Sequence, residues 1–190
     1  MTTLYSFCTQ SGCPNGSFPG WGELVQTISG DLYRTTEIGG YNCASCYGTA
    51  FKITPSGTLT TIYNFCSQSG CDNGSAPVGG LTPTENGDTY GTTSEGGSDH
   101  AGTLFSITPS GTLTTLYIFC SQSPLYCLDG GEPEQALAQA TDGDFFGTTS
   151  VGGAGCPNSK GLCGTVFKIT PSGTLTTLHS FCSQSACAIP

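Results

Sequence analysis

The sequence GTAFKITPSGTLTTIYNFC, at residues 48–66, decides the fold of this chain. It returns as GTLFSITPSGTLTTLYIFC at residues 102–120 and as GTVFKITPSGTLTTLHSFC at residues 164–182. The copies begin 54 and then 62 residues apart, and the differences in length fall in Gly- and Cys-rich segments. Self-similarity of this kind indicates a tandem-repeat architecture. We therefore expect three copies of one structural unit.

Each unit is predicted to contain four short β-strands. In the first copy these are residues 24–27, 31–36, 49–54 and 58–65. Ser-Gly-Asp joins the first two strands, and Asn-Gly-Asp or Asp-Gly-Asp replaces it in the later copies; such turns favour hairpins because Gly, Asn and Asp tolerate positive φ. Pro-Ser-Gly joins the last two, with Pro fixing φ and Gly taking the left-handed position. The sequence predicts an all-β fold of four-stranded antiparallel units.

Apolar residues occupy both faces of the predicted strands. In residues 58–65, Leu59, Tyr63 and Phe65 share one face, whereas Ile62 lies on the other. A sheet that packs against neighbours on both faces needs this pattern, as in the blades of a β-propeller. A two-layer sandwich shows a clearer alternation of apolar and polar residues. We therefore expect blade-like sheets that stack on one another.

A second signature precedes the repeated stretch, with the pattern DG-x-x-YGTT-x-x-GG. In the third copy the two signatures occupy residues 142–143, 147–149, 152–153 and 164–181. Together they resemble the Gloeo-Verruco (GloVer) tandem repeat of exported bacterial proteins, over nearly the whole chain. The resemblance implies propeller-like blades on secreted or surface proteins, and it implies no enzymatic activity. The chain departs from the pattern in its Cys pairs and in Arg34, where the other copies have Gly.

The predicted units occupy residues 14–71, 72–127 and 128–190, after an extra N-terminal segment at residues 1–13. Within that segment, residues 2–7 match the fourth strand of a unit and are predicted to form an unpaired strand. A closed propeller has about 4 to 8 blades, so three blades leave open end faces that invite association. We expect a fragment of a longer propeller, or copies that complete one another in a ring or fibre, with β-augmentation by the extra strand.

Twelve cysteines fall into six pairs that are close in sequence. We predict six short-loop disulfides, which indicate an oxidising compartment and an extracellular or cell-surface location. Each would stabilise the fold by about 2 kcal/mol in the chain-entropy model. Reduced thiols or zinc sites are the alternative, and a structural clip is favoured over redox chemistry for the one Cys-x-x-Cys pair. The predicted pairs are Cys8–Cys13, Cys43–Cys46, Cys66–Cys71, Cys120–Cys127, Cys156–Cys163 and Cys182–Cys187.

The charge balance argues against two classes of partner. The net charge is −9, with only four basic residues. An acidic surface repels phosphate backbones and anionic lipid headgroups, so we expect no nucleic-acid partner and no binding to anionic membranes. No apolar run reaches the roughly 18 residues that a spanning helix needs, so no membrane insertion is predicted.

Candidate metal and glycan sites are few. Asp142 and Asp144 are the best calcium candidates, in a hairpin turn where capping of the backbone is the favoured interpretation. Asn15-Gly-Ser and Asn73-Gly-Ser are N-glycosylation sequons at equivalent positions, and plain Asn-Gly turns are the alternative. The third copy has Asp129 there. We predict no cofactor.

No catalytic site is predicted. His100 and His179 have no partnered nucleophile, and no Gly-x-Ser-x-Gly elbow occurs. Glu132 and Glu134 lie in one loop of one copy, whereas a glycosidase pair faces across a cleft.

The sequence therefore predicts a non-enzymatic extracellular structural protein that self-associates, as a fibre or adhesin subunit or as a multi-chain propeller. The alternative is a glycan- or ligand-binding propeller module, with Trp21, Tyr33, Tyr90 and Phe146 as candidate sugar-binding aromatics. The last three align between copies, which favours core packing for them.

Overall fold

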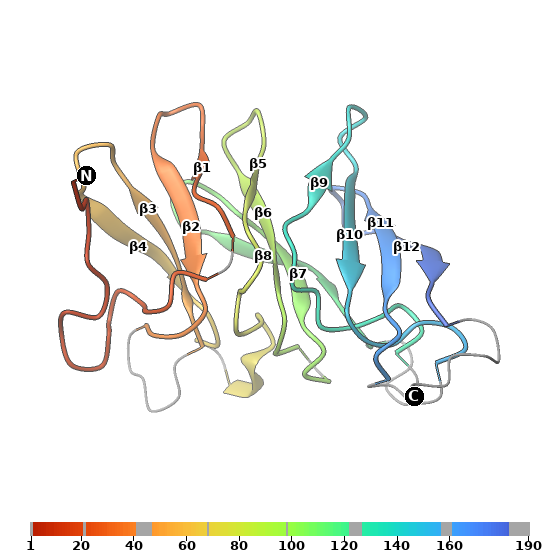
Figure 1. Ribbon diagram of the computed structural model, residues 1–190. Helices are drawn as coiled ribbons and strands as arrows, with labels where there is room; N and C mark the ends of the chain where they lie inside the picture. The colour runs from red at the N-terminus through yellow and green to blue at the C-terminus, as the bar shows by residue number, and fades with distance from the viewer. Residues whose placement is uncertain are drawn as a thin grey trace.

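The regular secondary structure of the described chain is almost entirely β-strand (Figure 1). A computed structural model describes residues 2–20, 22–40, 47–67, 69–97, 99–121, 127–156 and 161–182. Within these residues the chain forms three four-stranded antiparallel sheets, which we call blades 1, 2 and 3. The only helix in them is one 3-10 turn, Ser69–Cys71. The all-β fold of tandem blade-like units is thus confirmed.

The strands of each blade follow one another in sequence and in space. Each begins and ends within a residue or two of the predicted bounds, because the Gly- and Pro-containing turns fix the strand ends. Blade 1 contains β1 (Val25–Gln26), β2 (Leu32–Thr36), β3 (Thr49–Ile53) and β4 (Leu59–Asn64). Blade 2 contains β5 (Thr82–Pro83), β6 (Thr89–Thr93), β7 (Thr103–Ile107) and β8 (Leu113–Ile118). Blade 3 contains β9 (Ala138–Gln139), β10 (Phe145–Thr149), β11 (Thr165–Ile169) and β12 (Leu175–Ser180).

The fourth strand of every blade carries the same β-bulge. In blade 1 the register shifts between Ala50 and Phe51, so that Ile62 of β4 has no partner residue on β3. The same shift leaves Leu116 of β8 and Leu178 of β12 unpartnered in their ladders. A bulge bends its strand and takes one residue out of the ladder. The carbonyl of the bulge residue is therefore placed to meet the next blade.

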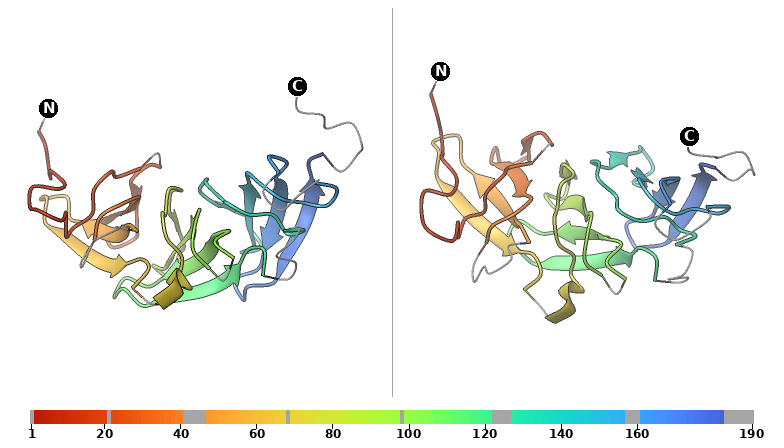
Figure 2. Two further views of the ribbon diagram at one scale, coloured as in Figure 1. Left: turned by 90° about the horizontal axis from the view of Figure 1, so that it is seen from below. Right: turned by 60° about the horizontal axis from the view of Figure 1, so that its bottom comes forward.

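The three blades stand side by side in an open arc (Figure 2). The short first strands β1, β5 and β9 lie on the concave side, and the long fourth strands β4, β8 and β12 lie on the convex side. Blade 1 and blade 3 form the two ends of the arc and do not meet. Each end blade therefore has one face without a neighbouring sheet.

The hydrophobic core lies between the blades. One buried cluster joins blades 1 and 2 and contains Tyr33, Phe65 and Phe105. A second joins blades 2 and 3 and contains Tyr90 and Phe167, among other residues. Apolar side chains project from both faces of each sheet, and stacking of the blades removes these side chains from water. Tyr33 and Tyr90 are thus core residues, as the core-packing interpretation expects.

The prediction of a β-strand at residues 2–7 is wrong. No strand is present there, although the segment lies against blade 1. The segment packs on the face of blade 1, where Phe7 meets Phe51, and its backbone forms no hydrogen bond with another described residue, so it joins neither edge strand, β1 or β4. A strand-like sequence without a partner strand does not form a ladder.

Candidate interaction site at the end faces

The two junctions inside the chain show how one blade binds the next. We call the face of a blade that the next blade covers its trailing face, and the opposite face its leading face. Phe65 at the end of β4 packs on Phe105 of blade 2, with ring centroids 5.1 Å apart and an interplanar angle of 60°. Phe119 packs on Phe167 of blade 3 in the same way, at 5.4 Å and 61°. Each junction therefore has this aromatic pair in the same geometry, and the second junction adds a stacked pair, Tyr90 and Phe145, with centroids 4.2 Å apart.

Polar contacts also repeat at the junctions. Thr35 of blade 1 directs its Oγ1 hydroxyl to two carbonyls of the second repeat, Pro77 at 2.8 Å and Gly79 at 3.3 Å. Thr92 of blade 2 donates to the carbonyl of Gln135, at 3.3 Å. Both threonines are buried, so these hydrogen bonds satisfy groups that stacking removes from water. Stacking is thus specified by polar as well as apolar contacts.

The glycine of each Pro-Ser-Gly turn fits against the preceding blade. A Cβ atom at Gly111 would collide with the carbonyl oxygen of Ile62, the bulge residue of blade 1. A Cβ atom at Gly173 would collide with that of Leu116, the bulge residue of blade 2. Both glycines also have φ near +90°, which other residues rarely adopt. The bulge and the turn are therefore matching parts of one junction.

Blade 3 exposes the residues that blades 1 and 2 bury at their trailing faces. Phe181 is 47% exposed, whereas its counterparts Phe65 and Phe119 are 4% and 0% exposed. Leu178 and Thr148 are likewise exposed. Phe146 and Val166, whose counterparts are buried in the other two blades, are half-buried. This trailing face has the composition of an interface but no neighbouring sheet over it.

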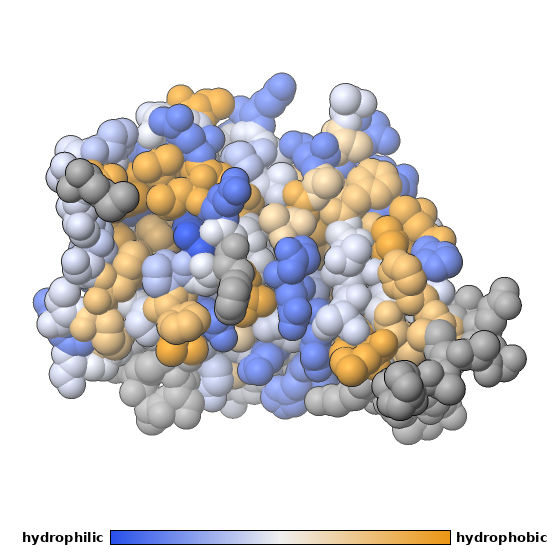
Figure 3. Space-filling view, in the orientation of Figure 1, coloured by the Kyte–Doolittle hydropathy of each residue, from blue (hydrophilic) through white to orange (hydrophobic). Residues whose placement is uncertain are grey.

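Blade 1 exposes part of its leading face. Leu24 is 47% exposed, whereas the equivalent Leu81 and Leu137 are 2% and 5% exposed. Phe51, the counterpart of Phe105 and Phe167, is nevertheless buried, because Phe7 covers it at 5.1 Å. In Figure 3 apolar surface is visible over blade 1 at one end of the arc and near β12 at the other. The two open ends thus carry complementary halves of a blade junction.

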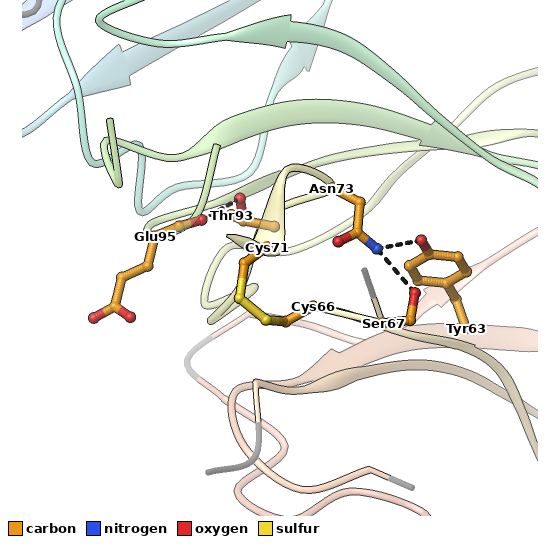
Figure 4. Close-up of a disulfide and its surroundings, with 7 residues drawn as sticks. All are labelled: Tyr63, Cys66, Ser67, Cys71, Asn73, Thr93 and Glu95. Carbon is orange, nitrogen blue, oxygen red and sulfur yellow. Dashed lines mark hydrogen bonds between the residues drawn. A yellow bond between two sulfur atoms is a disulfide. The ribbon is translucent and has the colours of Figure 1, made fainter. Parts of the chain in front are cut away.

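Among the described residues, four disulfides clip loops. Two follow the fourth strands β4 and β8, one lies between β10 and β11, and one follows the N-terminal segment. Their Cα atoms are 4.1 to 6.1 Å apart. Cys43, Cys46 and Cys187 lie outside the described residues, so the two remaining predicted pairs stay predictions. Figure 4 shows one clip beside the sequon residue Asn73. The four disulfides are Cys8–Cys13, Cys66–Cys71, Cys120–Cys127 and Cys156–Cys163.

The sequon residues have a structural role in the folded chain. Asn73 is 5% exposed, and its Nδ2 donates to the Tyr63 hydroxyl and, at 3.2 Å, to Ser67 (Figure 4). Asn15 donates to the Tyr5 hydroxyl at 2.7 Å. A glycan on either nitrogen would break these contacts, since glycans attach at Nδ2. Glycosylation of these residues stays a prediction that the folded geometry disfavours.

Asp129 replaces asparagine at the same place in the third repeat and reverses the hydrogen bond. The Tyr117 hydroxyl donates to Asp129 Oδ2 at 2.8 Å, and the Cys120 amide donates to the same oxygen at 3.0 Å. Burial is the main cause that raises the pKa of Tyr117 well above its usual value, and the hydrogen bond and charge of Asp129 add to it. This contact holds the clipped loop on β8. Sequence reasoning missed it, although the shared position of Asn15, Asn73 and Asp129 was a usable signal.

The calcium candidates have other partners. Asp144 Oδ2 forms an ion pair with Lys168 Nζ at 2.7 Å. Asp142 Oδ1 accepts from the Asp144 amide at 3.1 Å, the geometry of a capped turn. Among the described residues, no three Asp, Glu, His or Cys side chains converge as a metal site requires. The structure brings Asp142 and Asp144 together only within their own hairpin.

The remaining candidates do not converge. His179 makes an edge contact with Phe181, with centroids 4.9 Å apart, and shares no contact with His100. Glu134 lines a pocket of about 290 Å³ on the concave side, together with Glu23 and the backbone of Gly79 and Gly80. Trp21 lies outside the described residues.

The family comparison agrees with this geometry. The model of the Gloeobacter/Verrucomicrobia repeat matches residues 1–157. The chain belongs to this repeat family. Curated proteins gave no match. Within the described residues, no helix is long and apolar enough to cross a membrane.

Several solved structures are similar to the chain at low identity. One, provisionally named a gluconolactonase, has a TM-score of 0.47 and 15% identity, over 81% of this chain and 45% of its own. Streptogramin B lyase has a TM-score of 0.45 and 16% identity, over 86% of this chain and 42% of its own. Luciferin-regenerating enzyme has a TM-score of 0.47 and 11% identity, over 83% of this chain and 44% of its own. The chain spans less than half the length of each of these proteins.

Proposed function

We propose that this chain is a non-enzymatic extracellular structural module that self-associates, with the trailing face of blade 3 stacking on blade 1 of another copy. The exposure of Phe181 carries this proposal. Phe65 and Phe119 have the same place in their blades and are buried under the next sheet. The four disulfides support an oxidising setting outside the cytosol.

Blade 1 offers the parts that the trailing face of blade 3 needs. Within the chain, a trailing face meets a phenylalanine of the third strand, a leucine before the first strand and a turn glycine. Blade 1 provides Phe51, Leu24 and Gly57 at these places. A contact between different faces of identical copies is head-to-tail, so it closes into a ring or continues as a fibre.

A ligand-binding module is the second candidate. A pocket of about 430 Å³ lies between the hairpin turns of blades 2 and 3, and Asn86, Gln139 and Thr84 contribute polar groups to it. Amide and hydroxyl groups of this kind suit neutral, hydroxyl-rich ligands such as glycans. A glycan array tests this candidate, with the Gln139→Ala variant as the control. We expect the wild-type chain to bind glycans on the array and the variant to lose this binding.

Sedimentation velocity over a range of concentrations tests self-association. Leu178 lies on the trailing face, Leu128 directly follows the Cys120–Cys127 disulfide, and both are 51% exposed. Leu178→Ser and Leu128→Ser therefore remove the same apolar group at the same exposure. We expect Leu178→Ser to abolish association and Leu128→Ser to leave it unchanged. A wild-type chain that stays monomeric at all concentrations, or equal effects of the two variants, would refute the proposal.

A further inference from the structure

The segment at residues 2–7 takes the place of a fourth strand on the leading face of blade 1. Phe7 packs on Phe51 with centroids 5.1 Å apart and an angle of 59°. Phe65 packs on Phe105 at 5.1 Å and 60° at the next junction. Tyr5 lies edge-on to Phe7 at 5.0 Å and 75°, as Tyr63 lies to Phe65 at 5.3 Å and 76°. The segment thus reproduces the aromatic contacts of a trailing face without belonging to a sheet.

Two further contacts place the segment in this position. A Cβ atom at Gly57 would collide with the carbonyl oxygen of Leu4, just as one at Gly111 would collide with that of Ile62. Asn15 holds the Tyr5 hydroxyl as Asn73 holds that of Tyr63. Leu4 therefore occupies the place of a bulge residue, and residues 2–7 fill the position that the preceding blade would otherwise use.

The segment is held more weakly than the strand it imitates. No backbone hydrogen bond joins residues 2–7 to any other residue that the structure describes, whereas every residue of β4 except the bulge residue Ile62 has a partner on β3. Residues 2–4 are exposed, and Leu4 is 47% exposed. Packing of Phe7 on Phe51, the fit of Leu4 against Gly57 and one tyrosine hydrogen bond hold the segment in place. Release of the segment from blade 1 therefore breaks few of the backbone hydrogen bonds that would have to break if a strand left its sheet.

The segment and the end of blade 3 are almost the same peptide. Residues 2–8 read TTLYSFC and residues 176–182 read TTLHSFC, with a difference only at Tyr5 and His179. Both sequences therefore present the same leucine and phenylalanine to a leading face. Two identical apolar groups cannot occupy one position, so the presence of either segment on blade 1 excludes the other.

We propose that residues 2–8 are a removable cap on the leading face of blade 1, which the fourth strand of blade 3 in a second copy displaces when copies join. This inference rests on the proposed self-association and adds its regulation. Only a chain whose leading face is uncapped can bind the trailing face of another copy, so the concentration of uncapped chains determines how much association occurs. The apparent affinity between copies is reduced by the fraction of chains that are capped.

Weakening the cap is expected to strengthen association. Phe7→Ala removes the ring that covers Phe51 and should lower the dissociation constant between copies about tenfold, since it removes a large part of the cap's apolar contact. Adding Leu178→Ser to this variant should abolish the gain, because the same trailing face is still required. Circular dichroism and sedimentation velocity on each full-length variant give folding and association.

Competition by a synthetic peptide is a second test, and it does not require a variant to fold. The peptide TTLYSFS, residues 2–8 with serine for Cys8, should reduce association of the wild-type chain by occupying leading faces in trans. The peptide TTLYSSS, which lacks the Phe7 ring, should have no effect.

The outcomes separate the cap from self-association itself. If the wild-type chain associates through Leu178 but Phe7→Ala and TTLYSFS do not change its association, the cap proposal is wrong and the proposed function stands. If Phe7→Ala weakens association, residues 2–8 are part of the interface and the cap proposal is again wrong. If the wild-type chain stays monomeric at all concentrations, self-association fails as well.

Discussion

Two phenylalanines at the same place in their blades allow the energy of blade stacking to be measured. Phe119 and Phe181 both follow the fourth strand, and each lies edge-on to the aromatic side chain two residues before it. Phe119 is fully buried and also packs on Phe167, whereas Phe181 is 47% exposed. We predict that Phe119→Ala and Phe181→Ala will differ in their cost to stability because only one residue is covered by a neighbouring blade.

The magnitudes follow from burial. Truncation of a fully buried phenylalanine costs about 3–5 kcal/mol, including the cavity left behind. Phe181 is only about half buried and leaves no enclosed cavity, so Phe181→Ala should cost roughly 1–2 kcal/mol. The difference in the free energy of unfolding should be about 2–3 kcal/mol. This difference is what the next blade contributes at one side chain.

Urea unfolding under oxidising conditions, followed by circular dichroism, provides the measurement. The protein should be dilute enough that copies do not associate, since association would protect Phe181. Equal losses from the two variants would refute the reasoning, because they would show that the core lies within each sheet and not between sheets.

Three other predictions concern the clips, pH and salt. The double variant Cys66→Ser/Cys71→Ser should lower the free energy of unfolding by about 2 kcal/mol, the chain-entropy value for so short a loop, and urea unfolding checks this. The raised pKa of Tyr117 means that above about pH 10 the unfolded chain binds fewer protons than the folded chain, so stability should fall as pH rises further; Tyr117→Phe should flatten that part of the profile. Because each copy has a net charge of −9, raising NaCl from about 0.05 to about 0.5 M should strengthen association in sedimentation experiments, and a weakening would show that attraction between charges drives it.

The strands and local disulfides could be predicted because their signals are local. Hairpin turns such as Asn86-Gly87-Asp88 fix strand ends within a residue or two, and a cysteine five residues from another has few alternative partners. The three sheets and the pairs Cys8–Cys13 and Cys66–Cys71 follow from such signals.

The features that the sequence did not predict depend on which neighbour is present. Residues 2–7 have the composition of a fourth strand but have no partner strand, because they pack on the face of blade 1 through Phe7 and not along its edge. Asn73 belongs to a sequon, yet the clipped loop turns its amide inward to the Tyr63 hydroxyl. Phe65 and Phe181 are the same residue in the same motif, and only the presence of a following blade makes one buried and the other exposed.

Electron microscopy of the native protein across a range of concentrations tests the central claim most directly. If the trailing face of blade 3 binds blade 1 of another copy, the images will show rings or fibres in which the blades continue across the join between copies. Isolated open arcs of three blades at every concentration would contradict the account.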